Sequence, residues 1–399
     1  MADRAYKDTH AHIDYALDLR TATPQFWALL GEAKSKSQHI ARALLSPEAS
    51  HELMQVYLAK GVLATTAIEG NTLSEEEVRE VLEGRLQLPP SRQYLQQEVE
   101  NVLAAYNDAY SEILAHPEAP MTVGWLRRFN RRILEGLELE EGVVPGELRT
   151  GSVVVGRYRG PPAVDSEYLL ERLCEWINGP DFDAPDDRSE LAAPLAIVKA
   201  IVAHLYLAWI HPFGDGNGRT ARLLELQILL RAGFPAPACQ LLSNHYNLTR
   251  AEYYRQLDGA SRSQDELGFL SYAARGLVDQ LTQQLDVIRE RQFEDRWEHF
   301  VYQRFGGRTG ETAHRRLRAV LAISRRFLET EEPVLRREVP ALTPELAGAY
   351  ATKTSKTLTR DLNAITGMGL MRQDGKGLIP AFDLIQGLWP EVQGGVLFD

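Results

Sequence analysis

The 399-residue sequence contains only two cysteines, Cys174 and Cys239, so it supports neither a disulfide framework nor a cysteine-based zinc site. No uninterrupted apolar run reaches the length of a membrane span, because Lys199 and His204 interrupt the apolar stretch 194–210. The first residues lack the hydrophobic centre of a secretory signal. These absences predict a cytoplasmic protein without a membrane partner.

The remaining composition is that of a globular protein, with 44% hydrophobic and 25% charged residues, and the length suits two or three domains. The net charge of −11 argues against nucleic-acid binding by the whole chain. Residues 289–376, however, hold 17 Lys and Arg against 12 Asp and Glu, or +5, whereas the other residues hold 27 against 43, or −16. This asymmetry predicts a separate role for the C-terminal part.

The most informative segment is residues 211–222, which read HPFGDGNGRTAR. The apolar stretch before it, residues 194–210, predicts a buried helix, and Pro212 should end that helix at His211. The mostly apolar residues 219–233 predict a second helix, with Gly233 as its C-terminal cap. We therefore expect a rigid loop between two core helices.

The glycines of this loop, Gly214, Gly216 and Gly218, let its backbone adopt unusual conformations and approach a ligand closely. Asn217 and Gly218 should begin the second helix, where free N–H groups and the positive end of the helix dipole suit phosphate. Arg219 and Arg222 share a face of that helix, and arginine matches phosphate oxygens in a planar fork.

Two further side chains of the loop suit acid–base and metal chemistry. His211 accepts a proton near neutral pH, and Asp215 offers a hard oxygen to Mg²⁺, which completes its shell with phosphates and water. Taken singly, a histidine at a helix end is more often structural, and an aspartate in a glycine turn usually forms the turn. Two arginines beside core helices need anions, so together these residues favour a functional site. Phe213 is assigned to packing.

These twelve residues match HPFx(D/E)GNGRxxR without gap or substitution, so the chain resembles the Fic family of nucleotidyl transferases. The resemblance implies that His211 deprotonates a hydroxyl of a target protein and that Asp215 binds Mg²⁺. Gly218 favours nucleotidyl transfer, because the related death-on-curing toxins carry lysine there and transfer phosphate. The positions that the resemblance assigns to the nucleotide are Gly216, Asn217, Gly218, Arg219, Arg222 and Tyr254. On sequence alone the tyrosine pair Tyr253-Tyr254 is more often a core feature.

A second motif lies upstream, in residues 65–71, where a helix from about His51 should stop at Gly70 and Asn71. Ser74 with Glu77 predicts a capping box for the next helix. Glu69 stands at a helix C-terminus, where the dipole disfavours a carboxylate unless a cation meets it. An exposed, unpaired glutamate is the simpler alternative.

This segment also resembles the (S/T)xxxE(G/N) inhibitory motif of many Fic proteins. The resemblance implies that Glu69 pairs with Arg222 and displaces the γ-phosphate into an unproductive pose. In some relatives the same glutamate supports hydrolytic removal of the nucleotide, so the reverse reaction is a further expectation.

Residues 145–163 include a short β-prone run, Val153-Val154-Val155, before Gly156. This run resembles the Fic flap, a hairpin over the active site whose edge pairs with an extended segment of the target protein. An ordinary hairpin packed on the core is the alternative. Arg149-Thr150 and Pro161-Pro162 also fit the family pattern around the flap.

The expected fold is mainly α: a Fic helical bundle with a small β-hairpin flap, followed by a winged helix-turn-helix domain. We divide the chain into an N-terminal helical region (1–117) with the inhibitory helix, a Fic core (118–289) and the winged helix (290–399). Three helices within 314–369 and a hairpin turning at Asp374-Gly375 predict this last domain. Lys353, Lys356 and Arg360 would face DNA, although winged helices also dock proteins.

The leading hypothesis is a protein adenylyltransferase that uses ATP and Mg²⁺ to attach AMP to Tyr, Thr or Ser of a target protein, restrained by Glu69. One alternative is a DNA-binding regulator whose Fic core senses nucleotide. Another is an enzyme whose net activity removes AMP. Fic proteins often form dimers, so a homodimer is an expected assembly that the sequence does not decide.

Overall fold

The computed structural model describes residues 4–385, except the side chain of Val155, and it separates into two compact units, residues 1–288 and 289–399. Each unit has its own hydrophobic core. The three-part division expected from the sequence, with boundaries at 117 and 289, stays a prediction.

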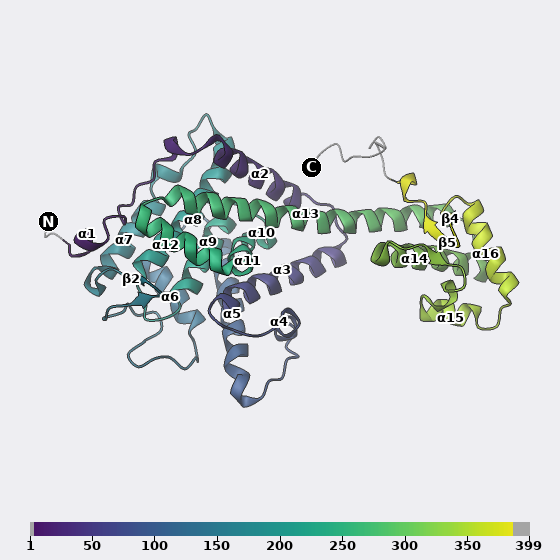
Figure 1. Ribbon diagram of the computed structural model, residues 1–399, viewed down its shortest axis with the longest axis horizontal. Coiled ribbons are helices and arrows are strands. Elements are labelled where there is room, and N and C mark those ends of the chain that lie inside the picture. Colours follow the sequence, from purple (N-terminus) through teal and green to yellow (C-terminus); the bar gives the residue numbers. More distant parts are fainter. Residues whose placement is uncertain (1–3, 386–399) are drawn as a thin grey trace. The chain divides into compact units, whose positions relative to one another are not determined.

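Unit 1 is a helical bundle with one small hairpin (Figure 1). Its helices are α1 (Tyr6–Thr9), α2 (Pro24–Ala41), α3 (Pro47–Ile68), α4 (Glu75–Leu82), α5 (Gln93–Ala115), α6 (Val123–Ile133), α7 (Ser166–Ile177), α8 (Ala192–Ile210), α9 (Asn217–Arg231), α10 (Ala236–Cys239), α11 (Leu241–Leu248), α12 (Arg250–Ser263) and the first part of α13 (Glu266–Phe305). The strands β1 (Val154–Val155) and β2 (Tyr158–Arg159) pair antiparallel. The expected helical fold with a hairpin is confirmed.

The centre of unit 1 is formed by α8 and α9, which pack against each other. The segment Ser189–Ile210, which includes α8, is long and apolar enough to cross a membrane by length and composition. Most of it is buried inside the bundle, and a helix that is apolar all round is typical of a protein core. Its apolar character therefore serves packing.

The helix ends follow the local signals in the sequence. Ser74 accepts a hydrogen bond from the N–H of Glu77, whose side chain accepts one from the N–H of Ser74, so the predicted capping box before α4 is present. The helix α3 ends at Ile68, and Gly70 follows with a φ of 106°. Gly233, just after α9, has a φ of 81°, a left-handed conformation that suits glycine.

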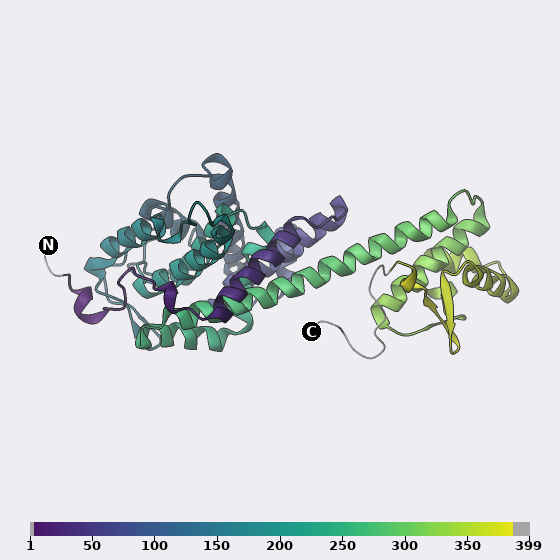
Figure 2. The same cartoon turned by 90° about the horizontal axis from the view of Figure 1, so that it is seen from above.

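Unit 2 contains the end of α13 and then α14 (Glu311–Thr330), β3 (Val334–Leu335), α15 (Pro344–Tyr350), α16 (Ser355–Gly367), β4 (Met371–Asp374) and β5 (Gly377–Pro380). The three helices and the hairpin β4–β5 were expected; the strand β3, which pairs with β5, was not. Figure 2 shows this hairpin in yellow. The order of helices and strands supports the winged-helix assignment, which stays a prediction.

Among the described residues of unit 2, the core encloses one buried carboxylate, that of Asp361 on α16. Arg315 and Arg316 on α14 each donate to it from Nε at 2.8 Å, and the hydroxyl of Tyr350 donates at 3.3 Å. Burial raises the pKa of Asp361, but the hydrogen bonds from the two arginines outweigh burial and hold this pKa below its ordinary value. The carboxylate therefore ties α16 to α14 in its charged form.

We expect Asp361→Ala to lower the free energy of unfolding of unit 2 by about 3 kcal/mol, because the buried Arg315 loses its counter-charge. The difference from wild type should shrink as the pH falls below about 4, because a carboxylate with a depressed pKa stabilises the fold only while it is charged. Hydrogen exchange of residues 311–380 in urea, measured in the full chain, tests this. Glu329→Ala, at a mostly exposed site, is the control and should change stability by less than about 1 kcal/mol. Equal effects of the two variants would contradict the role of Asp361.

Candidate functional site

The loop between α8 and α9 is shaped by its main chain. His211 ends α8 with a φ of 47°, a left-handed conformation that lets the chain turn before Pro212. Phe213 is fully buried, as expected, and its N–H donates to Oδ1 of Asn217 at 2.9 Å. Nδ2 of Asn217 donates back to the carbonyl of Phe213 at 2.9 Å, so this side chain closes the loop. The contribution of Asn217 to a ligand would then come from its backbone.

The glycines of the loop serve different purposes. Only Gly216 has a positive φ, 74°. At Gly214 a Cβ atom would lie 2.9 Å from the side chain of Val143, and at Gly218 it would collide with a carboxylate oxygen of Glu69. The expectation of an unusual backbone therefore holds at one of the three positions. Gly218 lines the cavity described below, where the lack of a side chain leaves room for a ligand.

Asn130 on α6 lies outside the motif but makes hydrogen bonds to its loop, a role that the motif sequence does not predict. Its side chain is fully buried, donates from Nδ2 to the carbonyl of Asp215 at 2.8 Å, and accepts from the N–H of Gly146 at 2.9 Å. The sequence offers one sign of this role: Asn130 lies among the apolar residues of α6, next to Phe129, where a buried polar side chain needs a hydrogen-bond partner.

Arg149 joins the loop to the hairpin. Its Nε donates to the carbonyl of His211 at 2.7 Å. Its Nη1 donates to the carbonyl of Gly151 at 2.6 Å, and its Nη2 donates to the carbonyl of Pro161 at 2.5 Å. The N–H of Arg149 also donates to the carbonyl of Pro212 at 2.9 Å. The sequence placed Arg149 in a family pattern, and the structure gives it the role of fixing the flap against the end of α8.

The two arginines of the motif are buried, with 6% of Arg219 and 2% of Arg222 exposed. Arg222 donates from Nε to the hydroxyl of Thr65 at 2.7 Å, and from Nη2 to the carbonyl of Thr65 at 3.0 Å and to Glu69 Oε1 at 2.6 Å. Arg219 lies 3.3 Å from Asp215 and 3.7 Å from Glu98. Its Nε and Nη1 find no hydrogen-bond partner among residues 4–385. Buried guanidinium donors of this kind call for an anion.

Glu69 lies opposite these arginines, at the C-cap of α3. Burial raises the pKa of Glu69, but the charge of Arg222 and its hydrogen bond outweigh burial and hold this pKa below its ordinary value. The pairing of Glu69 with Arg222 expected from the motif is therefore present in the structure. Of the alternative, the unpaired part is wrong, whereas the side chain of Glu69 does stay 31% exposed. Whether the pair inhibits a reaction is a separate question.

His211 faces the same space as Glu69. Burial lowers the pKa of His211 to about 4, because the charged form loses its hydration, and the positive charge of Arg149 lowers it further. The hydrogen bond to the carbonyl of Ala208, at 3.4 Å, and the charges of Glu69 and Asp215 act the other way without reversing this shift. Near neutral pH His211 is therefore uncharged and able to accept a proton.

A cavity of about 630 Å³ brings these groups together. Four residues of the two motifs line this cavity: Glu69, His211, Gly218 and Arg222. Its other lining residues are Gly156, Arg157, Tyr158, Ala208, Trp209, Tyr253, Tyr254, Arg255, Leu257 and Asp258. The volume lies in the range of small-molecule sites. The cavity lining does not include Asp215 and Gly216 of the loop, nor Asn217 and Arg219 in the first turn of α9.

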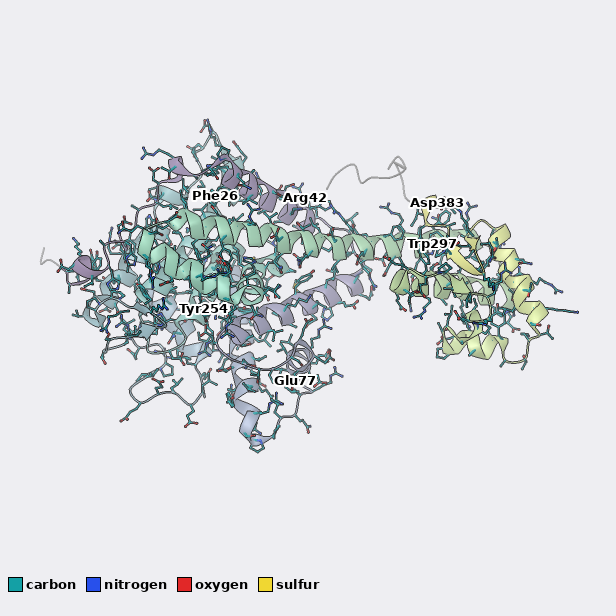
Figure 3. The ribbon with its side chains drawn as sticks, viewed as in Figure 1. Phe26, Arg42, Glu77, Tyr254, Trp297 and Asp383 are labelled. Carbon is teal, nitrogen blue, oxygen red and sulfur yellow. The ribbon has the colours of Figure 1, made fainter. Side chains whose placement is uncertain are left out.

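The tyrosine pair on α12 divides between two roles. Tyr253 is buried, and its hydroxyl lies 2.9 Å from Nε2 of His204, within a network that continues to Glu225. Tyr254, which Figure 3 labels, is 42% exposed, and it belongs to the lining of the cavity. The expectation that such a pair belongs to the core therefore holds for Tyr253 and is wrong for Tyr254.

The flap borders the cavity through Gly156, Arg157 and Tyr158, whereas Val153 and Val154 are not part of the lining. Val153 precedes β1, and its carbonyl accepts from the N–H of Gly160 at 3.1 Å. Val154 pairs with Arg159 and keeps 55% of its surface exposed, and Val155 pairs with Tyr158. The hairpin expected from the sequence is present, and its edge is accessible.

Asp215 is the one motif carboxylate suited to a metal. Half of its side chain is exposed, and Oδ1 accepts from the N–H of Gly216 and from Arg219. In the described part of the chain, no three His, Cys, Asp or Glu side chains converge on a common point.

We expect the imidazole of His211 to titrate with a pKa of about 4. The ring C–H resonances, assigned with His211→Ala and followed by NMR between pH 3 and 8, should move only at the acid end. A titration near 6.5, the ordinary value for histidine, would contradict the burial of this group.

Comparison with known proteins places the motif in a family. Residues 120–229 match the model of the Fic/DOC family. A protein named adenylyltransferase fic-1, from Caenorhabditis elegans, is 32% identical over 267 residues, which is 65% of this chain and 48% of the relative. A protein adenylyltransferase Fic from Nematostella vectensis is 30% identical over 211 residues, 53% of this chain and 45% of the relative. The chain thus spans about half the length of these relatives.

Solved structures agree with the sequence matches. Fic-1 from C. elegans, residues 134–508, superimposes with a TM-score of 0.55 at 26% identity, covering 67% of this chain and 73% of that one. A Fic family protein from Desulfovibrio desulfuricans G20 shares the fold, with a TM-score of 0.55 at 22% identity over 88% of this chain and 92% of that one. With the uninterrupted motif and the buried arginines in place, this chain is a member of the Fic family.

Proposed function

We propose that this chain is a protein adenylyltransferase that transfers AMP from ATP to a Tyr, Thr or Ser hydroxyl of a target protein. The observation that carries the proposal is a single cavity that unites a neutral imidazole, that of His211, with the buried guanidinium of Arg222. The similarity to proteins named adenylyltransferases supports the same reaction.

In the proposed reaction, the hydroxyl oxygen of the target bonds to the α-phosphorus of ATP while the bond to the leaving pyrophosphate breaks. His211 takes the hydroxyl proton at an imidazole nitrogen, which is available because the ring is neutral. The free N–H groups at the start of α9 and the unpartnered donors of Arg219 suit the phosphate oxygens. These fixed donors would stabilise the charge that develops at phosphate without having to reorganise.

Mg²⁺ is part of this proposal, with Asp215 as its ligand. A single accessible carboxylate fits Mg²⁺, which binds one or two carboxylates and takes substrate phosphates and water for the rest. When bound, the ion would offset negative charge on the phosphates.

Tyr254 and the flap would hold the two substrates. Tyr254 exposes its ring to the cavity beside Leu257, which suits the face of a nucleobase. The edge of β1 at Val154 would pair with an extended segment of the target and bring its hydroxyl to His211. The cavity does not distinguish one nucleobase from another, so ATP comes from the similarity to adenylyltransferases.

Glu69 would restrain the reaction by occupying Arg222. The carboxylate takes one of the guanidinium donors that a triphosphate would need, and Thr65 takes others. Glu69 also lines the cavity with His211, which keeps net removal of AMP, with Glu69 orienting water, as an alternative.

We expect Glu69→Gly to raise the rate of auto-modification roughly ten- to hundredfold, because a hydrogen bond to a charged group contributes about 1.5–3 kcal/mol. Adding His211→Ala to this variant should lower its auto-modification rate roughly 10²–10⁴-fold, which is the usual contribution of a general base. Mass spectrometry after incubation with a nucleotide mixture and Mg²⁺ measures the rate and identifies the transferred group. Label that persists without His211, or no label in either variant, would refute the proposed reaction.

A second candidate function is DNA binding by unit 2. The exposed residues Ser355, Lys356, Thr359, Arg360 and Asn363 gather on α16, whose single acidic residue, Asp361, is buried. A basic and polar helix face without exposed acid suits phosphate and base edges. Lys353, expected on the same face, lies 3.6 Å from Glu311, which offsets part of its charge. The cytoplasmic location and a homodimer stay predictions from the sequence and the family resemblance.

If unit 2 binds DNA, log K for binding falls linearly with the logarithm of the salt concentration. Changing Lys356 and Arg360 together to alanine should make this slope less steep by about two. Mobility shifts of the full chain on duplex DNA at several salt concentrations measure this slope. The matched control changes Arg325 and Arg326 on α14, which removes the same charge. The same loss in both variants, or no shift by wild type, would argue against this surface.

A further inference from the structure

The last turn of α3 accepts hydrogen bonds from a residue that belongs to neither sequence motif. Arg250, the first residue of α12, donates from Nη1 to the carbonyl of Ala67 at 3.0 Å and from Nη2 to the carbonyl of Ile68. Carbonyls in the last turn of a helix lack the intrahelical partners of those further in, so donors from elsewhere stabilise them. Tyr254, on the same helix α12, places its hydroxyl 3.5 Å from the carbonyl of Ile68.

This contact matters because Glu69 directly follows these carbonyls. The negative end of a helix dipole disfavours a carboxylate, and helix ends fray. The positive charge of Arg250 meets that negative end and fastens the main chain on which Glu69 stands. Without Arg250, only the backbone hydrogen bonds of the turn and the contacts of Arg222 would hold it, and Glu69 would be placed less firmly against Arg222.

Arg222 also binds this turn, through Thr65, but it lines the cavity and belongs to the proposed triphosphate site. A ligand that binds Arg222 would therefore loosen its hold on α3. Arg250 does not line the cavity, so its hold does not compete with the ligand. The two arginines thus have different roles: Arg222 is the group that Glu69 occupies, and Arg250 fixes where Glu69 stands.

We propose that Arg250 is a latch, a positioning residue that holds the last turn of α3 where Glu69 meets Arg222. The proposal rests on the adenylyltransferase function and on its restraint by Glu69. Because α12 also carries Tyr254, Leu257 and Asp258 into the cavity wall, the helix that shapes the nucleotide pocket is the helix that fastens the inhibitory turn. A shift of the first turn of α12 would change both together.

The test compares auto-modification rates of full-length variants with ATP and Mg²⁺. Arg250→Ala should raise the rate roughly threefold to thirtyfold, less than Glu69→Gly, because Glu69 is still present but less well held. Arg250→Lys should restore part of the restraint, since an ammonium still meets the carbonyls. The double variant Glu69→Gly with Arg250→Ala should match Glu69→Gly alone, because a latch has nothing to hold once the carboxylate is gone.

A matched control is Arg231 at the end of α9. Its Nη1 donates to the carbonyls of His116 and Pro117 at 3.0 and 2.7 Å, so it makes the same kind of contact away from the cavity. Arg231→Ala should leave the rate at the wild-type level. A rise equal to that of Arg250→Ala would overturn the latch, since a general loosening would then explain both.

Hydrogen exchange of residues 62–73 gives a readout that does not need activity. The N–H groups of Glu69, Gly70 and Asn71 donate to Thr66 and Ala67 in the last turn, so Arg250→Ala should speed their exchange. Unchanged exchange overturns the latch, whatever the rates are. If Glu69→Gly raises the rate and Arg250→Ala does not, the latch alone fails; if no variant is labelled, the adenylyltransferase proposal fails. A double variant slower than Glu69→Gly would assign Arg250 to the fold of the site and also overturn the latch.

Discussion

A buried guanidinium needs a partner, and Arg222 is the point on which the site depends. With 2% of its surface exposed, it has lost nearly all contact with water, and the free energy of burying its charge is offset by Glu69 and Thr65. Any anion that enters the cavity must compete with these internal ligands. The same contact therefore stabilises the resting protein and, if the proposal is right, would oppose the reaction.

The rigidity of the surrounding loop comes from main-chain hydrogen bonds made by buried side chains. Asn217 closes the loop on itself, Asn130 holds it to α6, and Arg149 fixes it to the flap. Because these groups are satisfied before any ligand arrives, the positions of His211 and of the start of α9 are set in advance. Preorganisation of this kind lets fixed dipoles act on a developing charge without reorganising.

Much of the site was predictable because its residues are close together in the chain. The apolar stretches on either side of His211 specify two core helices, and Pro212 and Gly233 mark their ends. In unit 2 the helices and the hairpin also follow from local signals, but the short strand β3 does not, since two residues carry too little periodicity. The side chains that a Cβ at Gly214 or Gly218 would meet, Val143 and Glu69, come from elsewhere in the chain, so these contacts could not be predicted.

The sequence by itself determined the chemistry available: an imidazole, a carboxylate and two arginines around a glycine-rich turn at the start of a helix. It also determined that Glu69 stands at a helix end. Only the tertiary structure decided what these groups meet: that Arg222 reaches Glu69 and Thr65, that two nitrogens of Arg219 make no hydrogen bond, and that Arg250 binds the end of α3. Local sequence sets backbone conformation over a few residues, whereas contacts between residues more than 150 positions apart depend on how the helices pack.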